Sequence, residues 1–275
     1  FTTSTFSMDL QNLADVMLPL LISKLEASDA DSDHEFRSLI KTLPLFLHLV
    51  ARSYAMKPTP ERKGQVRQIF DLLNNLLKKE VKENLTNEGQ NLTIEQKEAQ
   101  ILMNQRLLLA HFWKLVGILP VCFDINFATD VIYSFLCSIR DDKESLFLEK
   151  VKLLLKLSSE DVFWVNNSSK EKLNSIFIKV IDLALKKSRV YLDFFYQILA
   201  GIMYSPNSRF VLKFLPHLEK FLDDDDDEGS RHNPQLIHTL FTIAFNFPDT
   251  FPLKILNKLV FPMKKKFDVQ PPKPI

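Results

Sequence analysis

The sequence predicts an all-α protein, and composition and spacing are the observations that predict it. Of the 275 residues, 46% are hydrophobic and 25% are charged, which is typical of a chain that folds around an apolar core. Only 5 residues are Gly, each isolated, against 23 Phe. Glycine-rich phosphate loops and tight β-hairpin turns need clustered glycine, so nucleotide-binding and all-β folds are disfavoured. Apolar residues recur at helical rather than alternating spacing.

The first two helices are predicted from apolar periodicity and from nearby capping residues. The first spans residues 8–26, with Ser7 as its N-cap. Ser32 and Glu35 have the spacing of a capping box, which starts a second helix that ends near Ala55. A polar turn separates the two helices.

The third and fourth helices have the clearest start signals. Thr59 is followed by proline, the residue preferred at the first helical position, and an apolar stripe on one face follows. Thr93 with Gln96 predicts another capping box, and the fourth helix continues to Leu119. Because this helix is apolar nearly all round between Leu107 and Leu119, it is expected to be the most buried element of the N-terminal half.

Seven further helices complete the prediction, which contains no strand. Residues with capping potential precede the next three: Asp124 or Asn126 before the fifth, Asp141 or Asp142 before the sixth, and Ser168 with Glu171 before the seventh. The last four are expected near residues 192–203, 205–222, 233–247 and 252–267. Helix starts are about 25 residues apart on average, so a pair of helices occupies roughly 40 to 50 residues, which is the period of two-helix solenoid repeats.

A recurring phrase carries a resemblance to a known class of repeats. A Leu-Pro pair inside an apolar helical pattern occurs at Leu18-Pro19 and Leu215-Pro216, and in part at Leu43-Pro44. Leucines follow the first two prolines by two and six residues: Leu21, Leu25, Leu218 and Leu222. The phrase resembles a helix of HEAT or armadillo repeats, which implies an irregular HEAT/ARM-like α-solenoid of about eleven helices. The pairs are unequal and the Asp and Arg ladder of regular HEAT repeats is not evident, so a non-repetitive helical bundle stays the alternative.

The predicted organisation is one continuous helical domain over residues 1–270, followed by a proline-rich linker at 271–275. Mobile loops are expected near residues 83–92 and 223–232 because these stretches are polar. The first and last helices are strongly apolar, whereas a solenoid needs polar terminal repeats. We therefore expect a segment of a longer protein, or an end that packs on a partner.

Two charged clusters are the candidate partner-binding residues. The acidic cluster is Asp223, Asp224, Asp225, Asp226, Asp227 and Glu228, and the basic cluster is Lys264, Lys265 and Lys266. The acidic cluster is either a solvated loop between helices or a contact for a basic partner. The basic cluster either complements a helix C-terminus or binds phosphates.

No pattern in the sequence points to catalysis, to a metal or to a cofactor. The six histidines form no HExxH motif, and neither Cys122 nor Cys137 has a neighbour at zinc-ligand spacing. The two cysteines are interpreted as buried free thiols in a reducing compartment. No G-x-S-x-G motif or glycine-rich loop occurs. We therefore expect a protein that is not an enzyme.

The expected function is that of a protein-protein interaction scaffold that binds other protein subunits or peptides. The formal net charge of +1 gives no global field that would favour nucleic acid. The alternative is a nucleic-acid or transport-cargo binding module that uses basic ridges and the acidic loop. The expected localisation is intracellular, nuclear or cytoplasmic. Lys114 interrupts the apolar run 107–123, so membrane insertion is not expected.

Overall fold

A computed structural model of the chain describes residues 3–27, 33–80, 93–187, 212, 214–216, 219, 234–255 and 257. These residues form an all-α structure without a strand among them. The helices are α1 (Thr3–Ala27), α2 (Asp33–Met56), α3 (Pro60–Lys78), α4 (Ile94–Val116), α5 (Leu119–Cys122), α6 (Ile125–Ser138), α7 (Glu144–Ser158), α8 (Val162–Val165), α9 (Asn167–Lys187) and α13 (Pro234–Asn246).

The chain divides into two compact units, Phe1–Ile176 and Phe177–Ile275. The boundary falls inside α9, so this helix starts in the first unit and ends in the second. The predicted single domain 1–270 stays a prediction. The linker 271–275 and both predicted mobile loops lie outside the described residues. The helix expected near 192–203 and most of the helices expected near 205–222 and 252–267 lie outside them too.

Three predicted helix starts are confirmed, because local side chains satisfy the free N–H groups of a first turn. The Thr59 hydroxyl accepts from the backbone N–H of Arg62, and proline occupies the first turn of α3. Thr93 and Gln96 form the complete capping box of α4. The Asp124 carboxylate accepts from the backbone N–H of the third residue of α6 at 2.9 Å.

Three other predicted caps are wrong. Ser7 lies inside α1, which starts four residues earlier at Thr3. Ser168 lies inside α9, where the Asn166 side chain accepts from its backbone N–H instead. Neither Asp141 nor Asp142 caps α7, because both carboxylates are held by cationic side chains.

The fourth helix also differs from the prediction. It ends at Val116, and a break at Gly117 and Ile118 separates it from the short α5. One side of α4 is exposed, and it includes Ala110 and Trp113, so α4 is not buried all round. The apolar run is continuous in sequence, but packing covers only part of its circumference.

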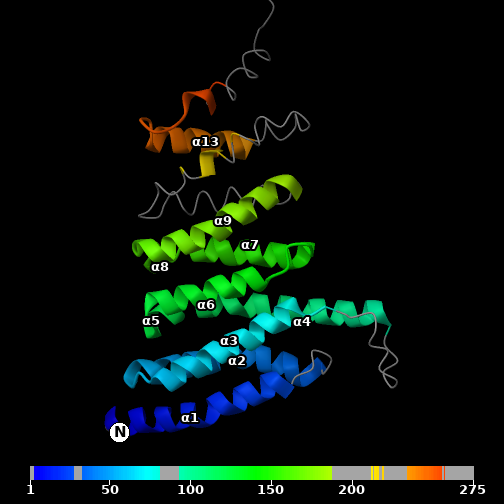
Figure 1. Cartoon of the computed structure of the whole chain (residues 1–275), viewed down its shortest axis with the longest axis vertical. Coiled ribbons are helices and arrows are strands. Elements are labelled where there is room, and N and C mark those ends of the chain that lie inside the picture. Colours follow the sequence, from blue (N-terminus) through cyan, green and yellow to red (C-terminus); the bar gives the residue numbers. More distant parts are fainter. Residues whose placement is uncertain are drawn as a thin grey trace, which may run out of the picture. The chain divides into compact units, whose positions relative to one another are not determined.

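The helices of the first unit pack in two rows (Figure 1). In one row α1 contacts α3 and α3 contacts α6, whereas in the other α2 contacts α4 and α4 contacts α7. Contacts between α1 and α2 and between α2 and α5 join the rows. Successive helices therefore alternate between the rows along the chain, and each row presents its own face.

The core of the first unit lies between the rows and between neighbouring helices. The stripe predicted on α3 is buried at Val66, Ile69, Phe70, Leu73 and Leu77. Aromatic rings link the helices: Phe112 of α4 stacks on Phe135 of α6 and meets Phe70 edge-on at 5.9 Å. Each large apolar side chain that is fully buried stabilises the unit by about 1.5–3 kcal/mol.

A buried arginine connects both rows near the start of the chain. Arg62 of α3 is only 6% exposed. Its guanidinium donates to the Asp15 carboxylate of α1 at 2.6 Å and to the Ser53 hydroxyl of α2 at 2.9 Å. One side chain therefore holds three helices together.

The leucines that define the Leu-Pro pattern of α1 face the core. Leu18, Leu21 and Leu25 are buried, whereas Pro19 is exposed on the other side. In the second phrase Leu215 is buried and Pro216 is exposed, while Leu218 and Leu222 lie outside the described residues.

The second unit is described mainly through α13, which confirms the helix expected near 233–247. One side of α13 is buried at Leu240 and Ile243, and nearby Phe251 and Ile255 are buried too. An ion pair between Lys254 and Glu219 spans 2.7 Å.

Candidate functional site

The sequence-predicted site residues lie where the structure describes nothing. Residues 223–228 and 264–266 are outside the described ranges, so both clusters stay predictions. Any candidate site has to be built from the described helices instead.

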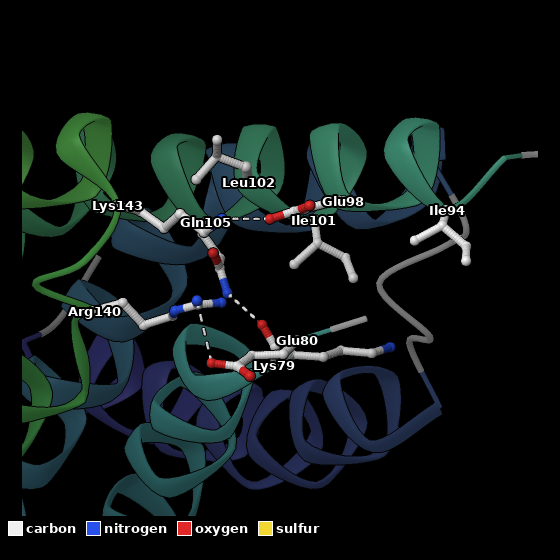
Figure 2. A pocket seen from close by; sticks show the side chains of 9 residues that line it. All are labelled: Lys79, Glu80, Ile94, Glu98, Ile101, Leu102, Gln105, Arg140 and Lys143. Carbon is white, nitrogen blue, oxygen red and sulfur yellow. Dashed lines mark hydrogen bonds and ion pairs between the residues drawn. The ribbon is translucent and has the colours of Figure 1, made fainter. Parts of the chain in front are cut away.

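A polar pocket of about 180 Å³ lies where the end of α3 and the link from α6 to α7 meet α4 (Figure 2). Three segments form it: the residues after α3, the first half of α4, and the link from α6 to α7. Its lining residues are Lys79, Glu80, Ile94, Glu98, Ile101, Leu102, Gln105, Arg140 and Lys143. Sites for small ligands usually measure about 300–1,000 Å³, so this pocket is small.

Arg140 is the charged centre of the pocket. Its guanidinium forms a fork with the Asp142 carboxylate, with distances of 3.1 Å from Nε and 2.7 Å from Nη2. The same Nη2 lies 3.2 Å from the Glu80 carboxylate. The hydrogen bond with Asp142 raises the pKa of Arg140 and lowers the pKa of the Asp142 carboxyl.

A second ion pair closes the pocket from the side of α4. The Lys143 ammonium donates to the Glu98 carboxylate (Figure 2), and this hydrogen bond lowers the pKa of Glu98. The Gln105 amide donates to the backbone carbonyls of Leu76, Leu77 and Lys79 at 2.9–3.1 Å. Gln105 therefore adds hydrogen bonds to carbonyl groups in the last turn of α3 and just after it, where the helical bonding pattern ends.

The ion pairs and hydrogen bonds of the pocket connect neighbouring elements. Arg140 and Lys143 are each paired with carboxylates, so neither is left to attract an anionic ligand. The lining contains no Ser, Cys or His, the side chains that most often supply a nucleophile or a general base. The geometry supports a structural role in joining α3, α4 and α7.

Sequence reasoning missed this pocket because its parts lie far apart in the chain. Asp141 and Asp142 were expected to cap a helix, whereas Asp142 pairs with Arg140 and Asp141 with the buried Lys150 at 2.7 Å. The charged run from Arg140 to Lys143 is the signal that was available, since dense opposite charges often form ion pairs.

Among the residues that the structure describes, the other reactive side chains do not assemble into a site. The Nδ1 atom of His111 is buried without a hydrogen-bond partner in the described structure, and burial lowers the pKa of this imidazole. Both cysteines are free; Cys122 is half-buried, with a thiol pKa raised by burial, and Cys137 is exposed rather than buried as expected. No three His, Cys, Asp or Glu side chains group as metal ligands within the described ranges.

Apolar side chains are exposed along the outer face of α1. Leu13, Val16 and Leu20 are 43%, 68% and 56% exposed. Their spacing of three and four residues places them on one side of the helix, opposite the buried Leu18 and Leu25. We call these three residues the α1 face.

Comparisons of the chain with protein families, with curated proteins and with solved structures found no match. None of the described helices has the length and apolar character that a membrane crossing requires.

Proposed function

We propose that the chain is a non-enzymatic scaffold for protein-protein interaction, built as an irregular α-solenoid and belonging to a larger protein or a multisubunit assembly. The alternation of helices between two rows in the first unit supports this architecture. Stacked helical pairs create extended faces, and such faces bind protein segments through side chains that are not needed for the core.

The α1 face is the observation that carries the proposal. Its three apolar side chains lie on the opposite side of α1 from the buried Leu18. Burying a side chain of this size stabilises a complex by about 1.5–3 kcal/mol before the entropic cost of association. The same kind of stripe on α3 packs between α1 and α6, so a helix of another protein fits the α1 face by the same geometry.

The described pocket argues against an enzymatic role. Arg140 and Lys143 of the pocket are paired with carboxylates, and the volume of the pocket is below that of ordinary substrate sites. The acidic cluster 223–228 and the basic cluster 264–266 remain candidates for further contacts with protein or nucleic acid.

Site-specific photo-crosslinking tests the proposal. A photoreactive amino acid replaces Val16 on the α1 face, and in a matched control it replaces Asp71, an exposed residue of α3 in the same row. The protein is irradiated in native extract. We expect a discrete covalent adduct with a protein from position 16 and none from position 71. Identical adduct patterns at both positions, or no adduct at position 16, would remove the support for the scaffold.

A further inference from the structure

Beyond their first residues, α2 and α4 carry exposed cations and no carboxylates. No Asp or Glu occurs in residues 36–60 or 99–123, which cover nearly all of α2, most of α4 and all of α5. These stretches carry the exposed cations Lys41, Arg52, Arg106 and Lys114. Elsewhere in the first unit cations and acids are interspersed, so this local excess of positive charge stands out in a chain of net charge +1.

The two helices form one continuous surface. Near the start of α2, Arg37 donates to the side chain of Asn104, which lies in the middle of α4, at 3.3 Å. Near the other end the Tyr54 ring stacks on Phe123, which follows α5, with ring centres 4.6 Å apart. The helices therefore run side by side in the same direction, as Figure 1 shows.

The four cations are available to a partner. No described residue forms an ion pair with Lys41, Arg52, Arg106 or Lys114. In the pocket, by contrast, Arg140 and Lys143 are paired with carboxylates. Lys114 instead lies 6.0 Å from the ring centre of the neighbouring Trp113. Unpaired cations keep their full attraction for an approaching acidic group.

Large apolar side chains are exposed between these cations. Leu45 of α2 is 60% exposed, and Met103 and Trp113 of α4 are 54% and 47% exposed. Leu45 follows Lys41 by one helical turn, and Trp113 follows Arg106 by two, so apolar and basic residues share the same side of each helix. We call these seven residues the basic face: Lys41, Leu45, Arg52, Met103, Arg106, Trp113 and Lys114.

We propose that the basic face binds an acidic amphipathic helix of a partner protein. Carboxylates of that helix pair with the four cations, and its apolar stripe contacts Leu45, Met103 and Trp113. Trp, Met and Arg are enriched at the centres of protein interfaces. Nucleic acid is the weaker match, because the aliphatic side chains of Leu45 and Met103 offer nothing to phosphates and do not stack on bases.

A peptide-binding assay with the whole chain tests this proposal. The probe is a labelled peptide of about 18 residues, a helix about 27 Å long, with a leucine stripe flanked by glutamates. A second peptide keeps the leucines and replaces every glutamate by lysine. An oligouridylate of similar length represents nucleic acid, and fluorescence anisotropy is measured across a range of salt concentrations.

We expect saturable binding of the glutamate peptide that weakens with salt, and no binding of the lysine peptide. The double substitution Lys41→Glu with Arg106→Glu weakens binding by about tenfold or more, and Trp113→Ala does so by a similar factor. The matched control is Arg67→Glu, the same charge reversal at an exposed residue of α3 in the other row. Circular dichroism checks that every variant is folded.

Several results would overturn the proposal: no saturable binding of the glutamate peptide, equal binding of the lysine peptide, tighter binding of oligouridylate, or equal effects of the control and double variants. The inference rests on the proposed function, because only an interaction protein needs such a face. The two fail separately. If photo-crosslinking at Val16 succeeds and the glutamate peptide does not bind, the proposed scaffold function is retained and the proposal that the basic face binds an acidic helix is rejected.

Discussion

Replacing Arg62 by methionine tests how the first three helices are held together. Arg62 lies on α3, is 6% exposed, and donates to Asp15 of α1 and to Ser53 of α2. Methionine keeps much of the apolar stem and removes the guanidinium. The substitution therefore isolates the polar contacts from the packing of the side chain.

The expected loss follows from the exposure of each partner. The Asp15 side chain is 61% exposed, so water replaces most of what Arg62 supplies, and this pair contributes at most about 1 kcal/mol. Ser53 is fully buried, and leaving its hydroxyl without the charged donor costs about 1–3 kcal/mol. Together we expect Arg62→Met to lower the free energy of unfolding by about 1–4 kcal/mol.

Urea unfolding followed by circular dichroism measures this loss. A loss in this range lowers the urea midpoint by about 0.5 M or more. Asp15→Asn is the matched control and is expected to cost at most about 1 kcal/mol. The reasoning is refuted if Arg62→Met unfolds within about 0.5 kcal/mol of the wild type, or if Asp15→Asn is equally costly.

Three further predictions concern other parts of the first unit. Gln105→Glu places a carboxylate against the last carbonyl groups of α3 and should lower the urea midpoint more than Gln105→Met does. Equal decreases of the midpoint in the two variants would contradict this role of the amide. Burial and two nearby lysines lower the pKa of His111, so the unfolded imidazole takes up its proton at higher pH and stability falls as the pH drops below about 6.5. In His111→Gln the melting temperature should change less between pH 7.5 and pH 5.5 than in the wild type, and an equal change in both proteins would refute this. Leu21→Asp should strongly destabilise the protein whereas Val16→Asp leaves thermal unfolding nearly unchanged, since only Leu21 faces the core; the reverse order would show that α1 is oriented the other way.

The helix starts could be predicted from the sequence where the capping contacts are local. Thr59, Thr93 and Asp124 cap helices through groups within three residues, and spacing alone reveals such contacts. Asp142 has the same capping potential, but a guanidinium two residues away forms the stronger charge-assisted fork. Competition between a cap and an ion pair depends on geometry that periodicity does not contain.

The extent of burial and the candidate surfaces were harder to predict. The apolar run of α4 suggested a helix covered on all sides, yet Trp113 faces outward because α4 has neighbours on only part of its circumference. The absence of acids in 36–60 and 99–123 was visible in the sequence. That these two stretches form one basic surface could be seen only from the side-by-side packing of α2 and α4, which joins stretches about 60 residues apart.

Hydroxyl-radical footprinting tests most directly whether the exposed helical faces are covered by protein. The measurement compares side-chain oxidation at Val16, Met103 and Trp113 in the purified chain with oxidation in the native assembly isolated from nuclease-treated extract. All three are exposed in the chain alone. The account predicts clear protection of these residues in the assembly. Equal oxidation rates in the two samples would contradict it, because an interaction scaffold cannot leave both of its proposed faces open.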